Sequence, residues 1–453
     1  MTPDIFTSAR ALGDAFEHGR ADPRDITEAC IHRIETGDSD HCIFYRRTFA
    51  RARIDAAAAH TRAKAGLRRA PLDGVPLSWK DLFDSAGDET CAGSPLLAGR
   101  VPVHDAAALA RLTQAGAVCL GKTAMTELAF SGLGINPAFG TPANPHDSTT
   151  ARVPGGSSSG AAVSVARRMC AAAIGTDTGG SVRIPAAWNG LVGFKPSFGR
   201  IPTDGSVPLC PSLDTIGPLT QDVEDAALLF AALTATRPSA LDDETLNGRT
   251  IICATGLVED TLAPDISAAI SEALSRIAAH GARTEDAVPP PLARMDHLTW
   301  QSGISLAAVE AWAVWGATIT RGGDRMYPPV RARFEGGAAV DAAAAWRQVR
   351  ERQALRADLA QRMAGADAIA LPTVPIDPPP ITALEAGGPA YDTANKAALR
   401  ATSLANQLDL CAITLPAGLS RAGLPVGLML MAPRGRDARL LRLARAAEKA
   451  LAG

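Results

Sequence analysis

Apolar side chains recur at helical spacing in the first part of the chain. Residues 5–18 and 24–36 show this period, and 44–66 is rich in Ala and Arg and contains no proline. Such a period predicts helices that bury one face. We therefore expect a helical segment over residues 1–66.

From residue 72 the pattern changes, because short apolar runs alternate with Gly/Pro turns and with helical stretches. The apolar runs predict buried strands at 75–79, 117–120, 171–175, 249–254, 368–371, 412–415 and 426–431. The helical stretches among them cover 105–115, 160–169, 223–234 and 436–451. This alternation is typical of an α/β protein.

The segment 264–364 interrupts the alternation with a mainly helical sequence, which the prolines of VPPP (288–291) break. It holds four of the six tryptophans, Trp300, Trp312, Trp315 and Trp346. Since α/β sequence frames it on both sides, we expect a single domain over 1–453 in which this divergent insert shapes the substrate pocket. The tryptophans would serve helix packing, a contact in a homodimer, or a hydrophobic pocket wall.

The composition argues against several classes of protein. With 45 basic and 47 acidic side chains the formal charge is −2, which does not favour binding of nucleic acid or of an anionic membrane through bulk charge. No apolar run reaches the length of about 18 residues that a membrane span needs, and the first residues do not read as a signal peptide. The eight cysteines contain no CxxC, and the eight histidines form no metal-binding cluster. We therefore expect a cytoplasmic protein with reduced thiols and no bound metal.

Lysine is scarce, since only six of the 45 basic residues are lysines: Lys64, Lys80, Lys122, Lys195, Lys396 and Lys449. A codon bias toward Arg explains the scarcity. Because Arg does not lose its proton in proteins, a remaining lysine can mark a place where deprotonation is required.

Two short motifs fail on their context. Residues 116–123 read GAVCLGKT, the letters of a phosphate-binding loop, but 117–120 is an apolar run that should itself form a strand. Residues 156–160 read GSSSG, the letters of a nucleophile elbow, but no apolar run of strand length precedes them. We therefore expect neither nucleotide binding nor a hydrolase triad centred on Ser158.

The turn sequence GTDTGGS at 175–181 has the composition of an oxyanion site. Gly179 and Gly180 lack a Cβ atom, so consecutive N–H groups can point at one ligand atom. Ser181, at the end of the turn, would place its hydroxyl beside these donors. The structural alternative is a Gly-rich turn in which Ser181 caps the helix that follows.

A serine nucleophile needs a base, and no histidine lies near these motifs. Lys80 follows the apolar run VPLSW and should emerge at the end of a strand. Desolvation lowers the pKa of a lysine from about 10.4, and a neutral lysine can serve as the base for a serine. Taken alone, Lys80 could equally be a solvated charge at the end of a strand.

Together these motifs resemble those of the amidase signature family. PGGSSSG at 154–160 and GTDTGGSVRIPAAWNGLVGFKPSFGRIP at 175–202 resemble the signature itself, and LDGVPLSWKDLFD at 72–84 resembles the family's lysine segment. Further segments that resemble the family lie at 115–132, 371–381 and 411–430. The family fold, a mixed twisted β-sheet flanked by helices, is the α/β architecture expected here. One departure is Met429, which stands where the family often has Gln.

The resemblance implies a Ser–Ser–Lys catalytic triad. Ser181 would be the acyl nucleophile, Ser157 the bridging serine and Lys80 the base. The oxyanion would be bound by the N–H groups of Thr178, Gly179, Gly180 and Ser181.

Other residues near these motifs receive supporting roles. We expect Asp177 and Arg183 to pair and to hold the loop in shape. Candidates for the substrate pocket are Phe130, Ser131, Gly132 and Leu133. Structural roles are expected for Lys122, Ser158, Ser159, Trp188 and Lys195.

The implied activity is hydrolysis of a small-molecule carboxylic amide to a carboxylate and an amine or ammonia, without metal or organic cofactor. Two alternatives within the family remain open. One is the glutaminyl subunit of a tRNA-dependent amidotransferase, and the other is a hydrolase of ureides such as carboxybiuret or allophanate. A third alternative is a catalytically silent binding protein on the same fold.

Overall fold

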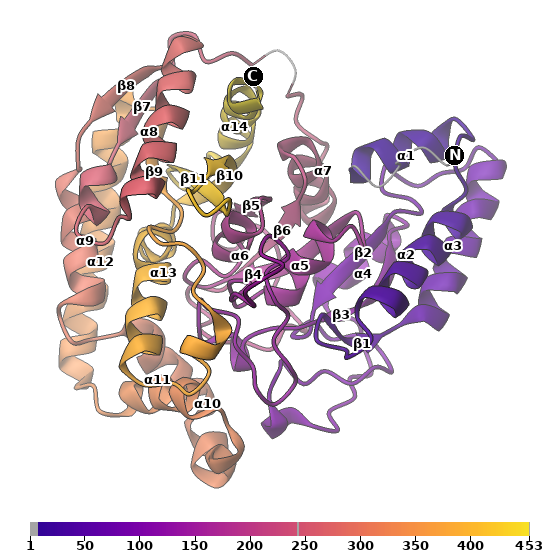
Figure 1. The fold of residues 1–453 in the computed structure, drawn as a ribbon, viewed down its shortest axis with the longest axis horizontal. Helices are drawn as coiled ribbons and strands as arrows, with labels where there is room; N and C mark the ends of the chain where they lie inside the picture. The colour runs from indigo at the N-terminus through magenta and orange to yellow at the C-terminus, as the bar shows by residue number, and fades with distance from the viewer. Residues whose placement is uncertain (1–7, 242–243, 453) are drawn as a thin grey trace.

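The computed structural model describes residues 8–241 and 244–452, and a sheet of eleven strands runs through them (Figure 1). From edge to edge the strands lie in the order β1-β3-β2-β4-β6-β5-β10-β11-β9-β7-β8. Pairing is parallel within β3-β2-β4 and β9-β7-β8 and antiparallel elsewhere, so the sheet is mixed. The strands are β1 (Phe44–Arg47), β2 (Pro76–Lys80), β3 (Val118–Thr123), β4 (Ala172–Asp177), β5 (Val192–Lys195), β6 (Thr215–Thr220), β7 (Thr250–Cys253), β8 (Arg283–Asp286), β9 (Ala368–Pro372), β10 (Cys411–Leu419) and β11 (Pro425–Ala432).

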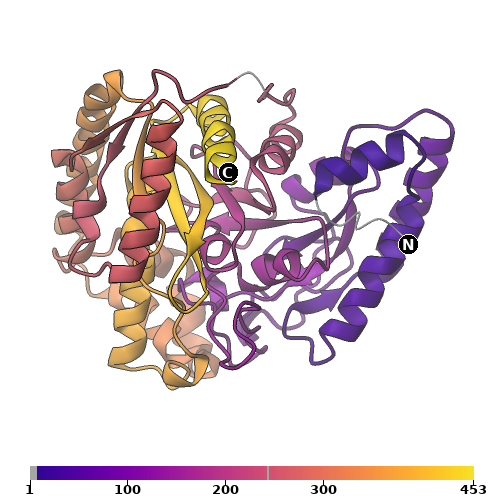
Figure 2. The same cartoon turned by 45° about the horizontal axis from the view of Figure 1, so that its top comes forward.

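Helices flank the sheet, with α1, α2 and α3 beside the β1 end and α9 and α12 beside the β8 end (Figures 1 and 2). Within the described residues, no helix is both long enough and apolar enough to cross a membrane. The helices are α1 (Ala9–Glu17), α2 (Pro23–Gly37), α3 (Phe49–Lys64), α4 (Ala107–Gln114), α5 (Ser159–Ala166), α6 (Arg183–Trp188), α7 (Val223–Thr234), α8 (Pro264–Ala279), α9 (Pro290–Trp300), α10 (Leu306–Gly322), α11 (Pro328–Ala338), α12 (Ala342–Arg362), α13 (Pro389–Gln407) and α14 (Asp437–Ala452).

Alternate residues of the central strands face opposite sides of the sheet, as the two-residue period of a strand requires. In β11, Leu428 and Leu430 pack in a core with α7, α8 and α14. Met429 and Met431 pack in a second core with α9, α12 and α13. Because β11 is buried on both faces, its sequence is a continuous apolar run, which is the pattern that predicts such strands.

Some strands carry no such run. β8 reads RTED and lies largely exposed at the edge of the sheet, and β6 reads TIGPLT, in which Gly-Pro interrupts the apolar residues. The prediction of a helix over 44–47 is wrong, because these residues form β1. Their backbone pairs antiparallel with β3, and this pairing overrides the local helical preference. Residues 5–7 of the first predicted helix lie outside the described residues.

The segment 264–364 contains the helices α8–α12 and the strand β8. Helix α8 packs on β10 and β11, whereas α10 and α11 pack on each other. The buried carboxylate of Glu127 joins the start of α11 to the body of the protein. It accepts hydrogen bonds from the Ser94 hydroxyl at 2.7 Å and from the Tyr327 N–H at 2.8 Å.

The close approach of β5 and β6 gives a test of the sheet. A Cβ atom at Gly217 of β6 would lie 2.0 Å from the carbonyl oxygen of Phe194 in β5. Since neither backbone can yield freely, Gly217→Ala should lower the free energy of unfolding by about 1–3 kcal/mol. The control Gly365→Ala, where the added atom meets open space, should stay within about 0.5 kcal/mol of the parent. Urea denaturation measures both, and equal values for the two variants would contradict this packing.

Candidate active site

Parallel pairing brings two chemically important strand ends together. β2 ends at Lys80 and β4 ends at Asp177, and the two strands pair in parallel. The carboxyl ends of parallel strands lie at the same edge of a sheet, where α/β proteins commonly bind ligands. Lys80 is therefore next to the turn that follows β4, although 97 positions separate it from Asp177 in the chain.

Lys80 is fully buried, with a relative exposure of 0%. Its Nζ donates to Ser157 Oγ at 2.7 Å and to Thr176 Oγ1 at 2.8 Å, and no ion pair to a described carboxylate accompanies these bonds. Burial lowers the pKa of Lys80 to about 7, against the opposing charges of Asp214 and Asp177. A substantial fraction of this amine is therefore neutral at neutral pH.

Ser157 lies in the loop that leads into α5, and this loop is held against the turn after β4. The Ser158 N–H donates to the carbonyl oxygen of Ser181 at 3.2 Å, and the Thr126 N–H donates to that of Ser157, also at 3.2 Å. Ser157 is completely buried, whereas Ser181 lines a cavity of about 350 Å³. The structure thus brings Lys80, Ser157 and Ser181 into one connected region.

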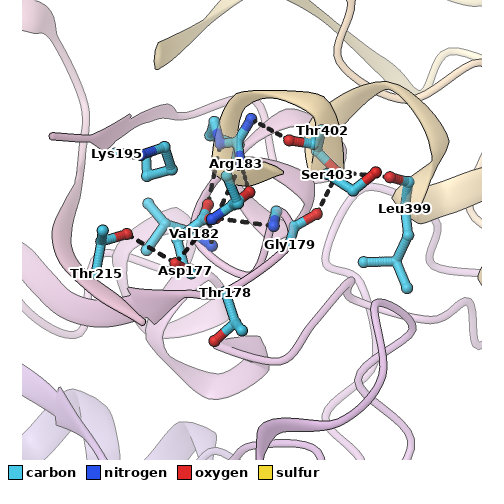
Figure 3. A network of polar contacts seen from close by, with 12 residues as sticks. Asp177, Thr178, Gly179, Val182, Arg183, Lys195, Thr215, Leu399, Thr402 and Ser403 are labelled. Atoms are coloured by element: carbon cyan, nitrogen blue, oxygen red, sulfur yellow. Dashed lines mark hydrogen bonds and ion pairs between the residues drawn. The ribbon is translucent and has the colours of Figure 1, made fainter. Parts of the chain in front are cut away.

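The turn after β4 is held by a buried ion pair between Asp177 and Arg183 (Figure 3). Arg183 donates to Asp177 through Nε at 3.0 Å and through Nη2 at 2.9 Å. Burial alone would raise the pKa of Asp177, but the charge and hydrogen bonds of Arg183 lower it to about 2. The two residues that we expected to support the loop therefore do pair.

Helix α13 completes this network, as Figure 3 shows. Arg183 Nη1 donates to the Thr402 carbonyl at 2.8 Å, and Asn406 Nδ2 donates to Asp177 Oδ1 at 2.9 Å. The Thr402 hydroxyl donates to the carbonyl oxygen of Gly179 at 2.7 Å. Three side chains from α6 and α13 thereby fix the peptide planes of the turn.

The four N–H groups expected to bind an oxyanion are not equivalent. The Gly180 N–H donates to Asp177 Oδ1 at 2.8 Å, so the turn itself uses this donor. Within residues 8–241 and 244–452, the N–H groups of Thr178, Gly179 and Ser181 have no acceptor. These three donors are therefore available to a ligand in the cavity.

Asp214 is a residue of the site that no sequence motif marked. It accepts the Thr178 hydroxyl at 2.5 Å and the N–H groups of Leu209 and Cys210 at 2.9 and 3.0 Å. Burial raises the pKa of Asp214, and these hydrogen bonds oppose the rise. It directly precedes β6. Because Gly-Pro interrupts the apolar residues of this strand, the sequence did not predict the strand and so did not place Asp214 at its start.

The cavity beside Ser181 only partly matches the expected pocket. Phe130 and Ser131 line it, but Gly132 and Leu133 do not. The Gly132 N–H donates to Asn395 Oδ1 at 2.9 Å, and Leu133 is buried in an apolar cluster, so both residues serve packing. The cavity wall also includes Trp300, Arg333, Leu399, Ser403 and Gln407, from helices whose sequences carry no recognisable motif.

The remaining motif residues have mostly structural contacts. Lys122 donates to the Glu89 carbonyl at 2.9 Å, Lys195 to the Pro196 carbonyl at 2.8 Å, and the Trp188 indole to the Ile376 carbonyl at 3.0 Å. Ser158 donates to the Thr176 carbonyl at 3.3 Å. Ser159 differs from the expected loop donor, because its buried hydroxyl has no partner among the described residues.

Two further features bear on the chemistry of the site. Met429, at the position where a Gln was expected from the resemblance, has its sulfur 3.0 Å from Arg183 Nη1. A thioether is a weak acceptor, so the stronger acceptors of this guanidinium are Asp177, the Thr402 carbonyl and Asn406 Oδ1, the last at 2.8 Å from Nη2. Among the residues that the structure describes, no three His, Cys, Asp or Glu side chains cluster so as to hold a metal ion.

Comparison with known proteins identifies relatives along nearly the whole chain. Residues 25–441 match the family model described as Amidase. A 2-amino-5-chloromuconic acid deaminase of Comamonas testosteroni is 37% identical over 432 residues, which cover 95% of this chain and 89% of that protein. A glutamyl-tRNA(Gln) amidotransferase subunit of Myxococcus xanthus (strain DK1622) is 32% identical over 95% of this chain and 94% of its own. A crystal structure of an amidase aligns with a TM-score of 0.87 at 31% identity, covering 98% of this chain and 100% of that one.

The buried ion pair of the turn can be tested through stability. Arg183→Ala would leave the Asp177 carboxylate buried without its counter-charge, which should lower the free energy of unfolding by about 3–5 kcal/mol. Arg331→Ala removes an exposed ion pair with Glu335 and should change it by less than about 1 kcal/mol. Denaturation curves of the two variants provide the comparison. If Arg183→Ala were as stable as Arg331→Ala, the pair would not be what holds the turn.

Proposed function

Because the chain belongs to the amidase signature family, it is a hydrolase of the carbon–nitrogen bond of amides, and we propose that Ser181 is its nucleophile. In this proposal Ser157 is the bridging serine and Lys80 is the base. The observation that carries it is the 2.7 Å hydrogen bond between Lys80 Nζ and Ser157 Oγ. Within residues 8–241 and 244–452 no carboxylate forms an ion pair with this fully buried amine, whose acceptors are the hydroxyls of Ser157 and Thr176, so burial dominates over the more distant charges of Asp214 and Asp177.

The acylation step uses the neutral form of Lys80. Ser181 Oγ attacks the amide carbonyl carbon while its proton passes to Ser157 Oγ, and the Ser157 proton passes to Lys80 Nζ. When the tetrahedral intermediate collapses, the carbon–nitrogen bond breaks and the relay returns a proton to the leaving nitrogen. The products are an amine or ammonia and an acyl group esterified to Ser181.

Deacylation repeats the same transfers with water. The water oxygen attacks the ester carbon, and its proton passes through Ser157 to Lys80. Collapse of this second intermediate breaks the bond to Ser181 Oγ, which regains the proton held by Lys80, and releases a carboxylic acid. The acid becomes a carboxylate by losing its remaining proton to the solvent or to the released amine. Lys80 is neutral again at the end of the cycle, so no external acid or base is consumed beyond water.

For the developing oxyanion we propose the N–H groups of Thr178, Gly179 and Ser181. The Gly180 N–H, which the resemblance included, is already bonded to Asp177 and acts by holding the turn. Donors that are fixed before the reaction need no reorganisation when charge develops. Asp177, Arg183 and Thr402 are positioning residues, because they orient these peptides and do not touch the reacting atoms.

The substrate that we propose is a small-molecule amide. The cavity of about 350 Å³ beside Ser181 fits a compact acyl group, and the Comamonas relative is named for a small organic acid. The relation to the glutamyl-tRNA(Gln) amidotransferase of Myxococcus keeps the role of a glutaminyl subunit in such an enzyme as a second candidate. Copurification of partner subunits with ATP-dependent use of glutamine would favour the second candidate over a free-standing amidase.

We also propose that the protein works in the cytoplasm. All eight cysteines are free thiols, and seven of them are buried. Thiols without disulfides are typical of proteins kept in a reducing compartment.

Labelling by a fluorophosphonate tests the nucleophile directly. We expect one adduct, located on Ser181 by peptide mass spectrometry, because among the described serines that line the cavity, Ser181 is the one in the turn that carries the free N–H groups. Ser181→Ala should abolish labelling, whereas the neighbouring control Ser158→Ala should keep an adduct. An adduct on Ser158, or none on the folded wild type, would reject the assignment.

The base can be tested through substitution and pH together. Lys80→Ala and Lys80→Arg should both lower kcat/KM by about 10³-fold or more, because Arg does not release its proton. The exposed control Lys396→Arg should behave as the wild type.

Since the neutral amine is the active form, wild-type kcat/KM should be constant well above pH 7 and decline by about tenfold per pH unit below it. Near-wild-type activity of Lys80→Arg, or a rate that rises as the pH falls below 7, would contradict the role of Lys80.

A further inference from the structure

The cavity beside Ser181 has one charged side chain in its described wall, Arg333 of α11. Its guanidinium carbon lies 4.5 Å from the centre of the Phe130 ring, which also lines the cavity. Phe130 is in turn packed edge-on against Phe334 at 4.8 Å. These aromatic contacts hold the guanidinium group against the cavity wall.

Arg333 differs from Arg183 and Arg62 in having no ion pair to a carboxylate among the described residues. Arg183 pairs with Asp177, and Arg62 pairs with Asp73. Among residues 8–241 and 244–452, no ion pair joins Arg333 to a carboxylate, and its buried Nε has no acceptor. The charge of Asp392 acts on Arg333 only from beyond ion-pair distance. Burial lowers the pKa of Arg333, yet a guanidinium remains protonated in proteins, so an unpaired cation is left at the cavity.

The other polar groups without partners in this wall are also hydrogen-bond donors. The indole N–H of Trp300 is buried without an acceptor. The side-chain oxygen of Gln407 accepts from Arg352 Nη1 at 3.1 Å, which leaves its NH₂ group without an acceptor among the described residues. Since no Asp or Glu lines the cavity there, the wall offers positive charge and N–H donors but no anion.

We propose that Arg333 binds a carboxylate of the substrate, so that the preferred substrates are amides that carry a second, acidic end. A half-amide of a short dicarboxylic acid has this form. Its amide carbon would lie at Ser181, and its carboxylate would accept two parallel hydrogen bonds from the guanidinium fork. The inference rests on the proposed role of Ser181, because it concerns the acyl side of the same cavity.

Matched pairs of substrates test this specificity. Half-amides from malonamate to adipamate are compared with the diamides of the same acids, which have the same length but no charge. For at least one chain length, the wild type should prefer the half-amide by about 10- to 100-fold in kcat/KM, the range expected for a hydrogen-bonded charge. Arg333→Gln should abolish the preference, mainly through a higher KM, and Arg333→Lys should keep part of it.

The controls separate this inference from the proposed function. Arg331→Gln alters an exposed arginine on the same helix and should leave the preference unchanged. Fluorophosphonate labelling of Ser181 reports the nucleophile, and its absence from the wild type would reject the proposed function itself.

If Ser181 is labelled, the dicarboxylate product should slow labelling of the wild type but not of Arg333→Gln. A wild type that prefers the diamides, or an Arg333→Gln variant that keeps the full preference, would overturn carboxylate binding at Arg333.

Discussion

The removal of one amine from water, Lys80 Nζ, is the constraint on which the candidate site depends. In water a lysine is almost fully charged at neutral pH. The buried amine of Lys80 instead donates to two neutral hydroxyls, those of Ser157 and Thr176, which stabilise its charge less than water does. The parallel pairing of β2 with β4 places this amine, because it brings the end of β2 beside the turn that carries Ser181. The order of the strands therefore buries the amine of Lys80, and this burial lowers its pKa.

Three charged side chains, two of them buried and one half-buried in the cavity wall, have different partners and different proposed roles. Asp177 remains ionised because Arg183 lies beside it, and the pair holds the turn. Lys80 has no ion pair with a carboxylate of the described residues and can lose its proton, so it can act as a base. Arg333 likewise has no ion pair within the part of the chain that the structure describes, but it cannot lose its proton, so its charge is available to a ligand. The same low dielectric thus strengthens an ion pair, makes an amine neutral or leaves a charge free for a ligand, depending on which groups lie beside the charged side chain.

The parts of the fold and site that could be predicted are those that their own local sequence determines. Strands such as β11 are buried on both faces and read as apolar runs, and the Gly-Gly-Ser turn and Lys80 lie in motifs that resemble a known family. By contrast, the strand conformation of β1 comes from its pairing with β3. The position of Asp214 is set by β6, a strand that no apolar run in the sequence predicts. Arg333 lies in a helix that no motif marks. Its proposed role depends on the lack of an ion pair with any described carboxylate, which only the three-dimensional arrangement reveals.

The central claim, that burial makes Lys80 a neutral base near neutral pH, can be measured without any substrate. The chain has only six lysines, so ¹³C NMR of protein labelled at the lysine Cε carbons, with Lys80→Arg for assignment, can follow Lys80 alone through a pH titration. The account predicts that Lys80 titrates at a pKa of about 7. Titration of Lys80 at the ordinary pKa of a lysine, about 10.4, would contradict this claim.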